Sequence, residues 1–527
     1  MGLNQVTGSP GISILNDVLG PVMRGPSSSH TAASYDIGRL AASLFNCPLE
    51  SIRVVFDPNG SYGQVYRQQG VDRGFAMGLL GLPLTDPVFF HSLEAVASSG
   101  IDLRFEVHPL INSDHPNSAD IHMRAADGRT LELRARSVGG GAIEITRLGS
   151  WEVLVTGQSH EVMIELTESA LPCVHALLGT DENMLGEPGL QFRNEIALLH
   201  AKSRIALTQM TRDAILAVPG VSHLWSTPPV AFVKQGSPLF GSAESMVSMA
   251  AVRGCSLGRL ALAHEAGLLG VTEQDVRAEM ALRLDLMYAS VQEGLSDRAP
   301  DMQLLTPTAG AIFRAEAEGR LAIGGLHARA AARALAVMHV NSGMGIVCAA
   351  PTGGSSGVLP AVLATLRDER SLTMDAAVLA ALAAGAIGIV VGARATFAAE
   401  VAGCQVEIGA AGAMAAAAVV EAAGGSAAQA ADAAAISFQN TMGTVCDLVQ
   451  GMVEIPCHTR NAVAASSAFV CADLIMGGYV NPIPLDDTID AVLAVGRMMP
   501  AELRVTSRGG LAITPSALNL PRRKVPI

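Results

Sequence analysis

The alternation of hydrophobic and polar positions divides the chain into a mixed first part and a helical second part. Up to about Thr156, short runs rich in β-branched and aromatic residues alternate with a helix-like stretch at residues 32–45. Five runs have the character of strands, at residues 52–56, 102–108, 131–136, 151–155 and 160–166. Amphipathic segments follow as far as Leu216. The pattern predicts an α+β domain over residues 1–217.

A linker and then a helical domain are expected after that. Residues 218–241 hold four prolines and several glycines, a composition typical of a connection. From residue 242 onward Leu, Met and Ala recur three and four positions apart, which predicts helices over 247–269 and 276–295. Thr272 with Asp275 three residues later is typical of a helix start. The pattern therefore predicts a helical domain over residues 242–527.

Beyond Asp375 this second domain becomes very rich in alanine, with breaks expected near Gly385, Gly409, Gly424 and Gly443. Such a composition predicts a bundle of closely packed helices. Residues 376–393 form an uncharged run of 18, long enough to resemble a membrane span. The run consists mostly of Ala and Gly, whose burial gains little free energy, and Arg394 follows it directly. We therefore expect a buried core helix, and an all-α, Ala-rich second domain.

Composition narrows the class of protein. With 527 residues, 50% hydrophobic and 16% charged, the chain is expected to form two or three domains with a large core. A net charge of −13 without a Lys/Arg cluster argues against nucleic acid. Eight cysteines are too sparse for a disulfide scaffold, and residues 1–20 lack the features of a secretory signal. We expect a cytoplasmic protein with free thiols.

Three of these thiols are candidate metal ligands. Cys404, Cys446 and Cys457 are separated by 42 and 11 residues, and no Cys-x-x-Cys pair occurs. The spacing alone is no zinc or ferredoxin signature, and three small buried hydrophobic residues would produce it too. Each cysteine has Gly, Asp, Pro or His neighbours rather than an apolar stripe, which favours ligands somewhat.

A second candidate site precedes the predicted helix at residues 32–45. Five hydroxyl or imidazole side chains follow one another there: Ser27, Ser28, Ser29, His30 and Thr31. Free backbone N–H groups, the helix dipole and short donors together favour a carboxylate or phosphate at such a position. Ordinary N-capping explains only one of the five, because one residue suffices for a cap.

Three shorter motifs are weak when taken singly. His115-Pro-Asn117 is usually a turn, and Ser137-Val-Gly139-Gly140-Gly141 predicts a tight turn or a close approach of backbone to a ligand. The Gly/Ser-rich residues 350–357, which include Thr352 and Gly353, lead into a predicted helix at 358–366. Each could be no more than a connection.

Taken together, these motifs resemble the iron–sulfur-dependent L-serine dehydratases, in a single-chain form with fused β and α domains. The first half resembles the β domain and the second half the α domain. The matching segments are residues 25–31, 70–73, 115–117 and 137–141, then 265–272, 350–357, 403–407, 446–447, 455–457, 460–461 and 508–510.

The resemblance implies a cofactor, a substrate and a reaction. Cys404, Cys446 and Cys457 would hold a [4Fe–4S] cluster, leaving one iron without a protein ligand and able to act as a Lewis acid. The substrate would be an amino acid or hydroxy acid such as L-serine, converted to a 2-oxo acid and ammonia. Residues implied in substrate binding are Ser27, Ser28, Ser29, Thr31, Asn117, Ser137, Gly139, Gly140, Thr352, Gly353, Arg460 and Asn461. A cytoplasmic homodimer in amino-acid metabolism and gluconeogenesis, without membrane or nucleic acid, is expected.

Three positions depart from the pattern of that family. Gln69 stands where the family often carries a histidine that is a candidate base, which leaves His30 and His115 as the catalytic candidates. Leu448 and Gln450 replace the Pro and Gly of the family's Cys-Asp-Pro-Val-Gly-Gly. No cysteine follows Cys471, so the C-terminal thiolate that caps the resting cluster in some relatives is missing.

Other functions remain open. Within the lyases, the substrate could be another β-hydroxy acid or amino acid, or L-cysteine with loss of sulfide. A catalytically silent relative that binds an amino acid is a different class. A pyridoxal-phosphate enzyme is disfavoured because Lys202, Lys234 and Lys524 lie outside glycine-rich loops. A serine hydrolase is disfavoured because no strand precedes its formal motif at 353–357, and a radical or electron-transfer protein because paired cysteines are missing.

Overall fold

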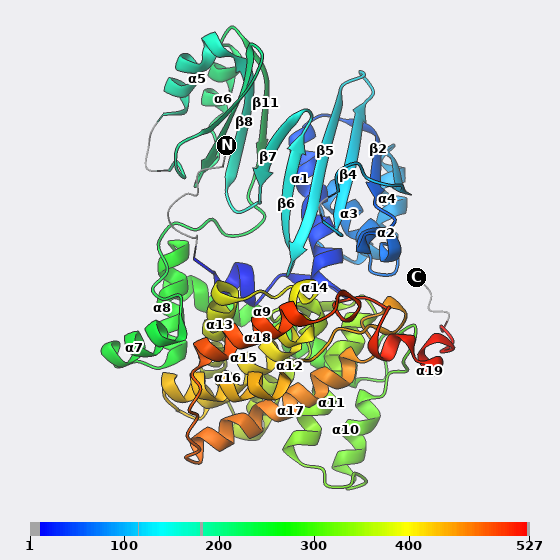
Figure 1. Cartoon of the computed structure of the whole chain (residues 1–527), viewed down its shortest axis with the longest axis vertical. Helices are drawn as coiled ribbons and strands as arrows, with labels where there is room; N and C mark the ends of the chain where they lie inside the picture. The colour runs from blue at the N-terminus through cyan, green and yellow to red at the C-terminus, as the bar shows by residue number, and fades with distance from the viewer. Residues whose placement is uncertain (1–10, 114, 180–182, 524–527) are drawn as a thin grey trace. The chain divides into compact units, whose positions relative to one another are not determined.

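The computed structural model describes residues 11–113, 115–179 and 183–523 (Figure 1). Within them the chain forms two compact units. Unit 1 comprises residues 32–138 and 142–235, and unit 2 comprises 11–31, 139–141 and 236–523. Residues 1–10, which are half of the segment predicted to lack a secretory signal, lie outside the described residues. Lys524 lies outside them too.

Unit 1 contains a six-stranded sheet in the order β3-β2-β4-β5-β6-β7. β2 and β3 are parallel, whereas β2 with β4, β4 with β5, and β6 with β7 are antiparallel. The strands are β2 Leu49–Phe56, β3 Asp102–Val107, β4 Ser118–Ala125, β5 Thr130–Gly139, β6 Ala142–Leu148 and β7 Trp151–Val155. The accompanying helices are α1 Ala33–Phe45, α2 Ser61–Val65, α3 Val71–Leu80, η3 Pro87–His91 and α4 Ser92–Ser98. Aromatic rings of Phe56, Tyr62, Tyr66 and Phe105 pack together in the core.

A four-stranded sheet in the order β11-β8-β10-β9 completes unit 1. Along the chain its elements alternate as β-α-β-β-α-β, the split β-α-β arrangement. They are β8 His160–Thr167, η4 Glu168–Ala170, α5 Leu171–Leu178, β9 Gly189–Arg193, β10 Ile196–Ser203, α6 Gln209–Leu216 and β11 Val221–Thr227. The structure thus differs from the predicted linker at 218–241, because β11 within it pairs with β8.

Unit 2 is mainly helical. Its longer helices are α7 Ala243–Arg253, α8 Leu257–Leu269, α9 Glu273–Leu295, α10 Ala309–Ala317, α11 Leu326–Ser342, α12 Val358–Arg370, α13 Met374–Arg394, α15 Ile408–Ala422, α16 Ala427–Thr441, α17 Cys457–Met476 and α18 Leu485–Met498. The short ones are η1 Ile14–Val18, η2 Ser28–Ala32, η5 Gly353–Ser355, α14 Ala399–Ala402, η6 Cys404–Val406, η7 Val449–Gly451, η8 Ala501–Leu503, η9 Gly510–Ile513 and α19 Pro515–Leu518. The predicted helix at 247–269 is two helices, because Gly254 ends α7 in the left-handed conformation. The capping box at Thr272 and Asp275 is confirmed.

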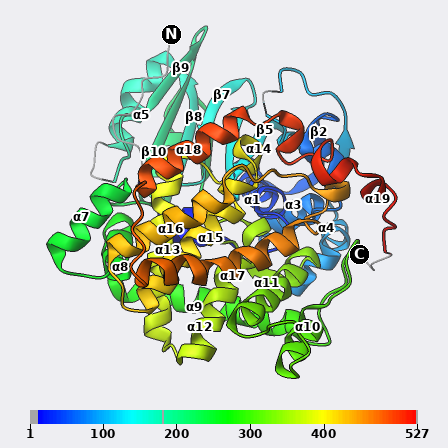
Figure 2. The same ribbon diagram turned by 60° about the horizontal axis from the view of Figure 1, so that its bottom comes forward.

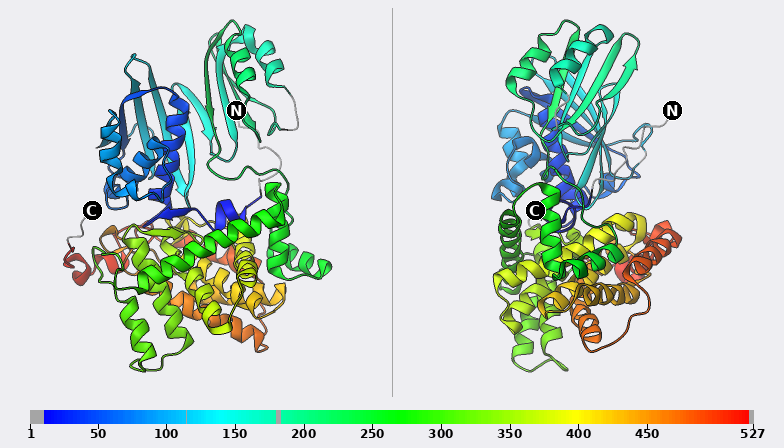
Figure 3. Two further views of the ribbon diagram at one scale, coloured as in Figure 1. Left: turned by 180° about the vertical axis from the view of Figure 1, so that it is seen from behind. Right: turned by 90° about the vertical axis from the view of Figure 1, so that its left-hand side faces the viewer.

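The core of unit 2 surrounds α15, which packs against α12, α13, α16 and α17 (Figure 2). α9, its longest helix, packs against α11, α12 and α13 (Figure 3). The expectation of an entirely helical domain needs one correction. β1 Val22–Arg24 pairs antiparallel with β12 Ile346–Cys348, which joins residues 22–24 to this unit.

One of the four expected glycine breaks is wrong, because Gly385 lies inside α13. α15 begins at Ile408, next to Gly409, and α15 and α16 end just before Gly424 and Gly443. Gly385 and Gly409 both serve close packing. A Cβ on Gly385 would lie 2.5 Å from Ile14 Cγ2, and one on Gly409 would lie 2.7 Å from Thr441 Oγ1. Their small size therefore lets neighbouring segments approach without interrupting either helix.

Two helical stretches among the described residues are long and apolar enough to cross a membrane by length and composition, Met374–Arg394 and Cys404–Ala422. Most of each stretch is buried inside the structure. The side chains of α13 from Ala377 to Val391 are almost all covered by protein, in agreement with the buried helix expected at 376–393.

Candidate active site

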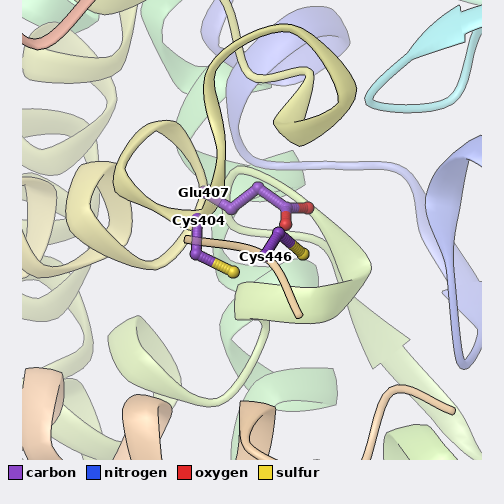
Figure 4. Close-up of side chains that lie close together, drawn as sticks. All are labelled: Cys404, Glu407 and Cys446. Atoms are coloured by element: carbon purple, nitrogen blue, oxygen red, sulfur yellow. The ribbon is translucent and has the colours of Figure 1, made fainter. Parts of the chain in front are cut away.

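Cys404, Cys446 and Cys457 come from three separate segments of unit 2, and each is at most 3% exposed. Cys404 begins η6, Cys446 precedes η7, and Cys457 begins α17. The sulfurs of Cys404 and Cys446 and a carboxylate oxygen of Glu407 all lie within 4.8 Å of one another (Figure 4). All three cysteines are free thiols. The described part of the chain therefore contains a group of side chains able to hold a metal.

Backbone contacts explain why the first two cysteine segments meet. Gly403 has φ +75°, which favours glycine, and a Cβ there would lie 2.9 Å from the Thr444 carbonyl. The Gln405 backbone N–H donates to the same carbonyl at 3.3 Å, and the Gln405 side chain accepts from Gly443 N at 2.9 Å. The segment of Cys404 is thus tied to the turn that leads to Cys446.

Arg460 and Asp447 form an ion pair beside the thiols. Arg460 Nη2 lies 3.0 Å from Asp447 Oδ1, and Arg460 Nη1 donates to the Val445 carbonyl at 2.7 Å and lies 3.7 Å from Cys404 Sγ. Asp447 is 2% exposed and also accepts from Leu511 N at 2.8 Å. The guanidinium therefore brings positive charge to the sulfurs while its own position is held by a buried carboxylate.

The thiols differ in how readily they ionise. A hydrogen bond from Cys446, aided by Arg460, lowers the pKa of Cys404 in spite of its burial. The same hydrogen bond, burial and the neighbouring negative charges raise the pKa of Cys446 well above its ordinary value. Burial and the charges of Cys404 and Glu407 do the same to the pKa of Cys457. A second and third thiolate here need a cation to offset their charge.

Glu407 follows Cys404 by one helical turn. Its Oε1 accepts a hydrogen bond of 2.9 Å from Thr352 Oγ1, on the Gly/Ser-rich loop predicted as a site. Burial, then the charges of Cys404 and Glu400, raise the pKa of the Glu407 carboxyl well above its usual range. In the sequence, Glu407 stands only as the last residue of the segment 403–407 that resembles the family. The Cys404-x-x-Glu407 spacing, one turn of helix, is the signal that could have singled it out.

The predicted anion turn at Ser27–Thr31 belongs to unit 2 and contacts the same loop. Ser28 Oγ accepts from Gly353 N at 3.4 Å, and a Cβ on Gly353 would lie 3.1 Å from Ser28 N. Thr31 N and His30 N donate to the Ser27 carbonyl, which shapes the turn into η2. Contacts within one unit therefore link the anion turn to the Gly/Ser-rich loop. They link that loop in turn to Glu407 and the cysteines.

His30 is almost entirely buried, and its Nδ1 lies 3.0 Å from Ser27 Oγ. Burial lowers the pKa of the imidazole to about 3. The ring is therefore uncharged near neutral pH and exchanges hydrogen bonds with its neighbours in that form.

Arg460 and Asn461, both predicted to bind substrate, make extensive contacts with protein. Asn461 is fully buried; its amide nitrogen donates to the carbonyls of Gly354 and Cys457, and its oxygen accepts from Gly357 N at 3.1 Å. This side chain joins the Gly/Ser-rich loop to the residue that begins α17.

Unit 1 carries His115, Asn117 and Ser137. Ser137 N donates to the Asn117 carbonyl at 3.2 Å, which continues the pairing of β4 with β5. Asn117 Oδ1 and Ser137 Oγ are buried without a hydrogen-bond partner among the described residues. His115 Nδ1 accepts from Asn117 N at 3.2 Å, which assigns the ring proton to Nε2 in the neutral imidazole. The predicted Gly139 ends β5 and Gly140 begins the turn after it. Both belong to unit 2, where a Cβ on Gly139 would lie 3.2 Å from Ala398 Cβ.

One departure from the family pattern has a structural role. Gln450 adopts φ +53°, a conformation that favours glycine. Its side chain donates to the carbonyls of Ala517 and Leu520 and accepts from Arg522 Nε at 2.8 Å. The glutamine thereby holds residues 517–522 against η7.

Comparison with known proteins identifies the family of this chain. The family described as "Serine dehydratase alpha chain" matches residues 196–512, about 60% of the chain. The "Probable L-serine dehydratase, alpha chain" of Bacillus subtilis (strain 168) is 36% identical over 288 residues, covering 54% of this chain and 95% of the relative. The "L-serine dehydratase, alpha chain" of Peptoniphilus asaccharolyticus is 35% identical over 275 residues, covering 52% and 94%. "L-serine dehydratase 1" of Escherichia coli (strain K12) is 38% identical over 182 residues, covering 34% and 40%. The chain belongs to the serine dehydratase alpha chain family.

Proposed function

We propose that this protein is an iron–sulfur-dependent L-serine dehydratase, which converts L-serine to pyruvate and ammonia. The observation that carries the proposal is the proximity of buried free thiols from distant segments, within a chain of this family. The sulfurs of Cys404 and Cys446 lie within 4.8 Å of each other, and Cys457 interacts electrostatically with both. Relatives that bear the name L-serine dehydratase support the same substrate.

The donor set fits a [4Fe–4S] cluster. Thiolate sulfur is the usual ligand of such clusters, and three thiolates would leave one of the four irons without sulfur from the protein. Cys404, Cys446 and Cys457 would hold it, and a cluster bound there would supply a Lewis acid that assists departure of the substrate hydroxyl. The charge of Arg460 offsets part of the negative charge of the thiolates.

The other predicted residues bind and orient the substrate in this proposal. The Ser27–Thr31 turn, at the N-terminal end of η2 and α1, favours the substrate carboxylate through hydroxyl and backbone donors. Asn117 Oδ1 and Ser137 Oγ are supporting candidates in unit 1, because a buried polar atom without a partner is costly unless a ligand pairs with it. Gly139 and Gly140 have positive φ, and a Cβ on Gly353 would lie 3.1 Å from Ser28 N, so these three positions favour glycine and supply backbone groups. Thr352 begins the loop that contains Gly353.

Roles for the remaining candidates follow from their contacts. The two histidines transfer protons or orient the substrate in this proposal. His30 is uncharged and hydrogen-bonded to Ser27, and His115 carries its proton on Nε2. Arg460 and Asn461 act on the substrate indirectly. Arg460 holds Asp447 in place, and Asn461 holds the Gly/Ser-rich loop at Gly357. We also propose that the helical unit 2, which includes the Ser27–Thr31 turn, is the iron–sulfur domain. The protein would be a cytoplasmic homodimer that acts on a small molecule.

Alanine replacement of single cysteines tests the proposal. Anaerobically reconstituted Cys404→Ala, Cys446→Ala and Cys457→Ala proteins are expected to lose the brown colour and the release of pyruvate from L-serine. Cys348→Ala and Cys471→Ala are matched controls, since both residues are buried free cysteines outside the proposed ligand set, and Cys471 lies on α17 with Cys457. Both controls should keep colour and turnover.

Two results would count against it. Full turnover in an iron-free protein would remove the cluster from the reaction. A brown protein that releases no 2-oxo acid from L-serine, from other β-hydroxy amino acids or from L-cysteine would indicate a silent amino-acid-binding relative.

A further inference from the structure

Glu407 is an acidic side chain placed among sulfur ligands. One of its carboxylate oxygens lies within 4.8 Å of both Cys404 Sγ and Cys446 Sγ, and Figure 4 shows the carboxylate turned toward the Cys446 sulfur. Cys404 and Glu407 are separated by one helical turn, at the start of α15. The arrangement places an oxygen donor where the sulfur donors converge.

No positive side chain neutralises this carboxylate. Among the residues that the structure describes, no Lys, Arg or His nitrogen forms an ion pair with Glu407. Its charged neighbours are Cys404 and Glu400, both of which carry negative charge when ionised. The nearby cation, Arg460, is engaged by Asp447 and Val445. A carboxylate in such surroundings is stable as an anion only if a metal or another cation binds it.

The orientation of the Glu407 carboxylate is also fixed by hydrogen bonding. The Thr352 hydroxyl holds Oε1 at 2.9 Å, and Thr352 itself is fixed in the capping box of η5 with Ser355. A Cβ on Gly354 would lie 3.6 Å from Oε1 and 3.9 Å from Oε2 of Glu407, in ordinary van der Waals contact, so the loop backbone lies close to the carboxylate. The hydrogen bond to Thr352 and the position beside two sulfurs give the carboxylate the fixed orientation that a ligand needs.

We propose that Glu407 is the protein ligand of the cluster iron that no cysteine holds, in the enzyme free of substrate. The inference rests on the proposed function, because it needs a cluster on Cys404, Cys446 and Cys457. Residues 472–527 contain no cysteine, so this stretch offers no thiolate for the position. A carboxylate is a harder and less tightly held ligand for this iron than a thiolate, which allows the substrate hydroxyl to displace it.

Electron–nuclear double resonance in ¹⁷O-labelled water tests the ligand directly. The reconstituted protein, reduced with dithionite, is measured without substrate. Wild type is expected to show no ¹⁷O coupling, because Glu407 occupies the position that water would take. Glu407→Gln is expected to show the coupling. Glu400→Gln is the matched control: it removes a neighbouring carboxylate that lies outside the group of ligand atoms, and it should behave as wild type.

A second variant tests the proposal if Glu407→Gln fails to assemble the cluster. Glu407→Cys would supply a fourth thiolate, and its cluster should survive air about ten times longer than that of wild type, a change of the size expected when a metal's ligand environment is altered. Equal lifetimes would overturn the proposal.

The outcomes separate the two hypotheses. Strong ¹⁷O coupling in a wild-type protein that forms its cluster and deaminates L-serine would overturn the role of Glu407 and leave the proposed function intact. A wild-type protein that forms no cluster on the three cysteines would overturn both.

Discussion

Glu454 provides a quantitative test of how the segment before Cys457 is held. Its carboxylate is 1% exposed and accepts three backbone N–H groups: Gln303 N at 2.9 Å on Oε1, and Leu304 N at 2.9 Å and Leu305 N at 2.7 Å on Oε2. His458 N donates to the Glu454 carbonyl, so the residue also begins the turn that carries Cys457 into α17. Glu454→Gln keeps the shape and changes only the hydrogen bonding.

The cost follows from the geometry. A glutamine oxygen in the place of Oε2 keeps the bonds to Leu304 and Leu305, without the charge that strengthens them. Its NH₂ group then faces Gln303 N–H, so one partly buried donor loses its partner, which costs about 1–3 kcal/mol. With the weakening of the other two bonds, and with the cheaper burial of a neutral side chain, we expect a loss of about 2–4 kcal/mol in the free energy of unfolding.

The assay is urea unfolding of the apo-protein followed by circular dichroism at 222 nm, which reports mainly on the helices. Both tryptophans lie in unit 1, so fluorescence would follow the wrong unit. Iron content after anaerobic reconstitution is the second readout, and it should fall in Glu454→Gln because the Cys457 segment is loosened.

Glu265→Gln is a closely matched control. Glu265 is fully buried in the same unit and accepts Ile14 N on one oxygen, and Leu15 N and the Ser13 hydroxyl on the other. It should lose a similar amount of stability and keep its iron, because its contacts fix the start of η1. A loss below about 1 kcal/mol in Glu454→Gln would refute the estimate. Equal iron loss in both variants would refute the specific link to Cys457.

Two further predictions concern packing and pH. A Cβ on Gly25 would collide with the backbone carbonyl of Asn341, so Gly25→Ala should lower the free energy of unfolding by about 3 kcal/mol. Gly267→Ala, at an exposed position inside α8 with open space around it, should raise it by up to about 1 kcal/mol, and urea unfolding that ranks the two variants in the opposite order would contradict this account. Burial raises the pKa of Asp36 to about 7, so its contribution to stability is complete below the unfolded pKa of 3.8 and is lost as the pH rises through 7. Because the side chain is 17% exposed and lies 3.2 Å from Arg39, we expect wild type to lose about 2 kcal/mol more than Asp36→Asn over that interval. Tryptophan fluorescence follows this unit, and parallel pH profiles for the two proteins would contradict the prediction.

Local pattern was enough to predict much of the fold. Alternation over 151–155 and 160–166 is a property of the strand itself, and β7 and β8 occupy those residues with at most one residue of difference. The spacing that predicted a helix after Thr272 likewise depends on residues within a few turns, and α9 begins where its capping box requires. The six-stranded sheet order and the β1–β12 pair were beyond such reasoning, because pairing joins residues far apart in the chain.

The sequence by itself determined the chemical inventory: three cysteines in polar surroundings, a run of hydroxyl side chains before a helix, and glycines at the turns. Only the tertiary structure decided how that inventory is used. Asn461 proved to bond three backbone groups, and Glu407 to stand beside two sulfurs, since both contacts depend on which distant segments meet. Gly385 and Gly409 could not be recognised as packing residues from the sequence alone. Whether a glycine is needed for packing depends on which distant atoms occupy the space where a side chain would lie.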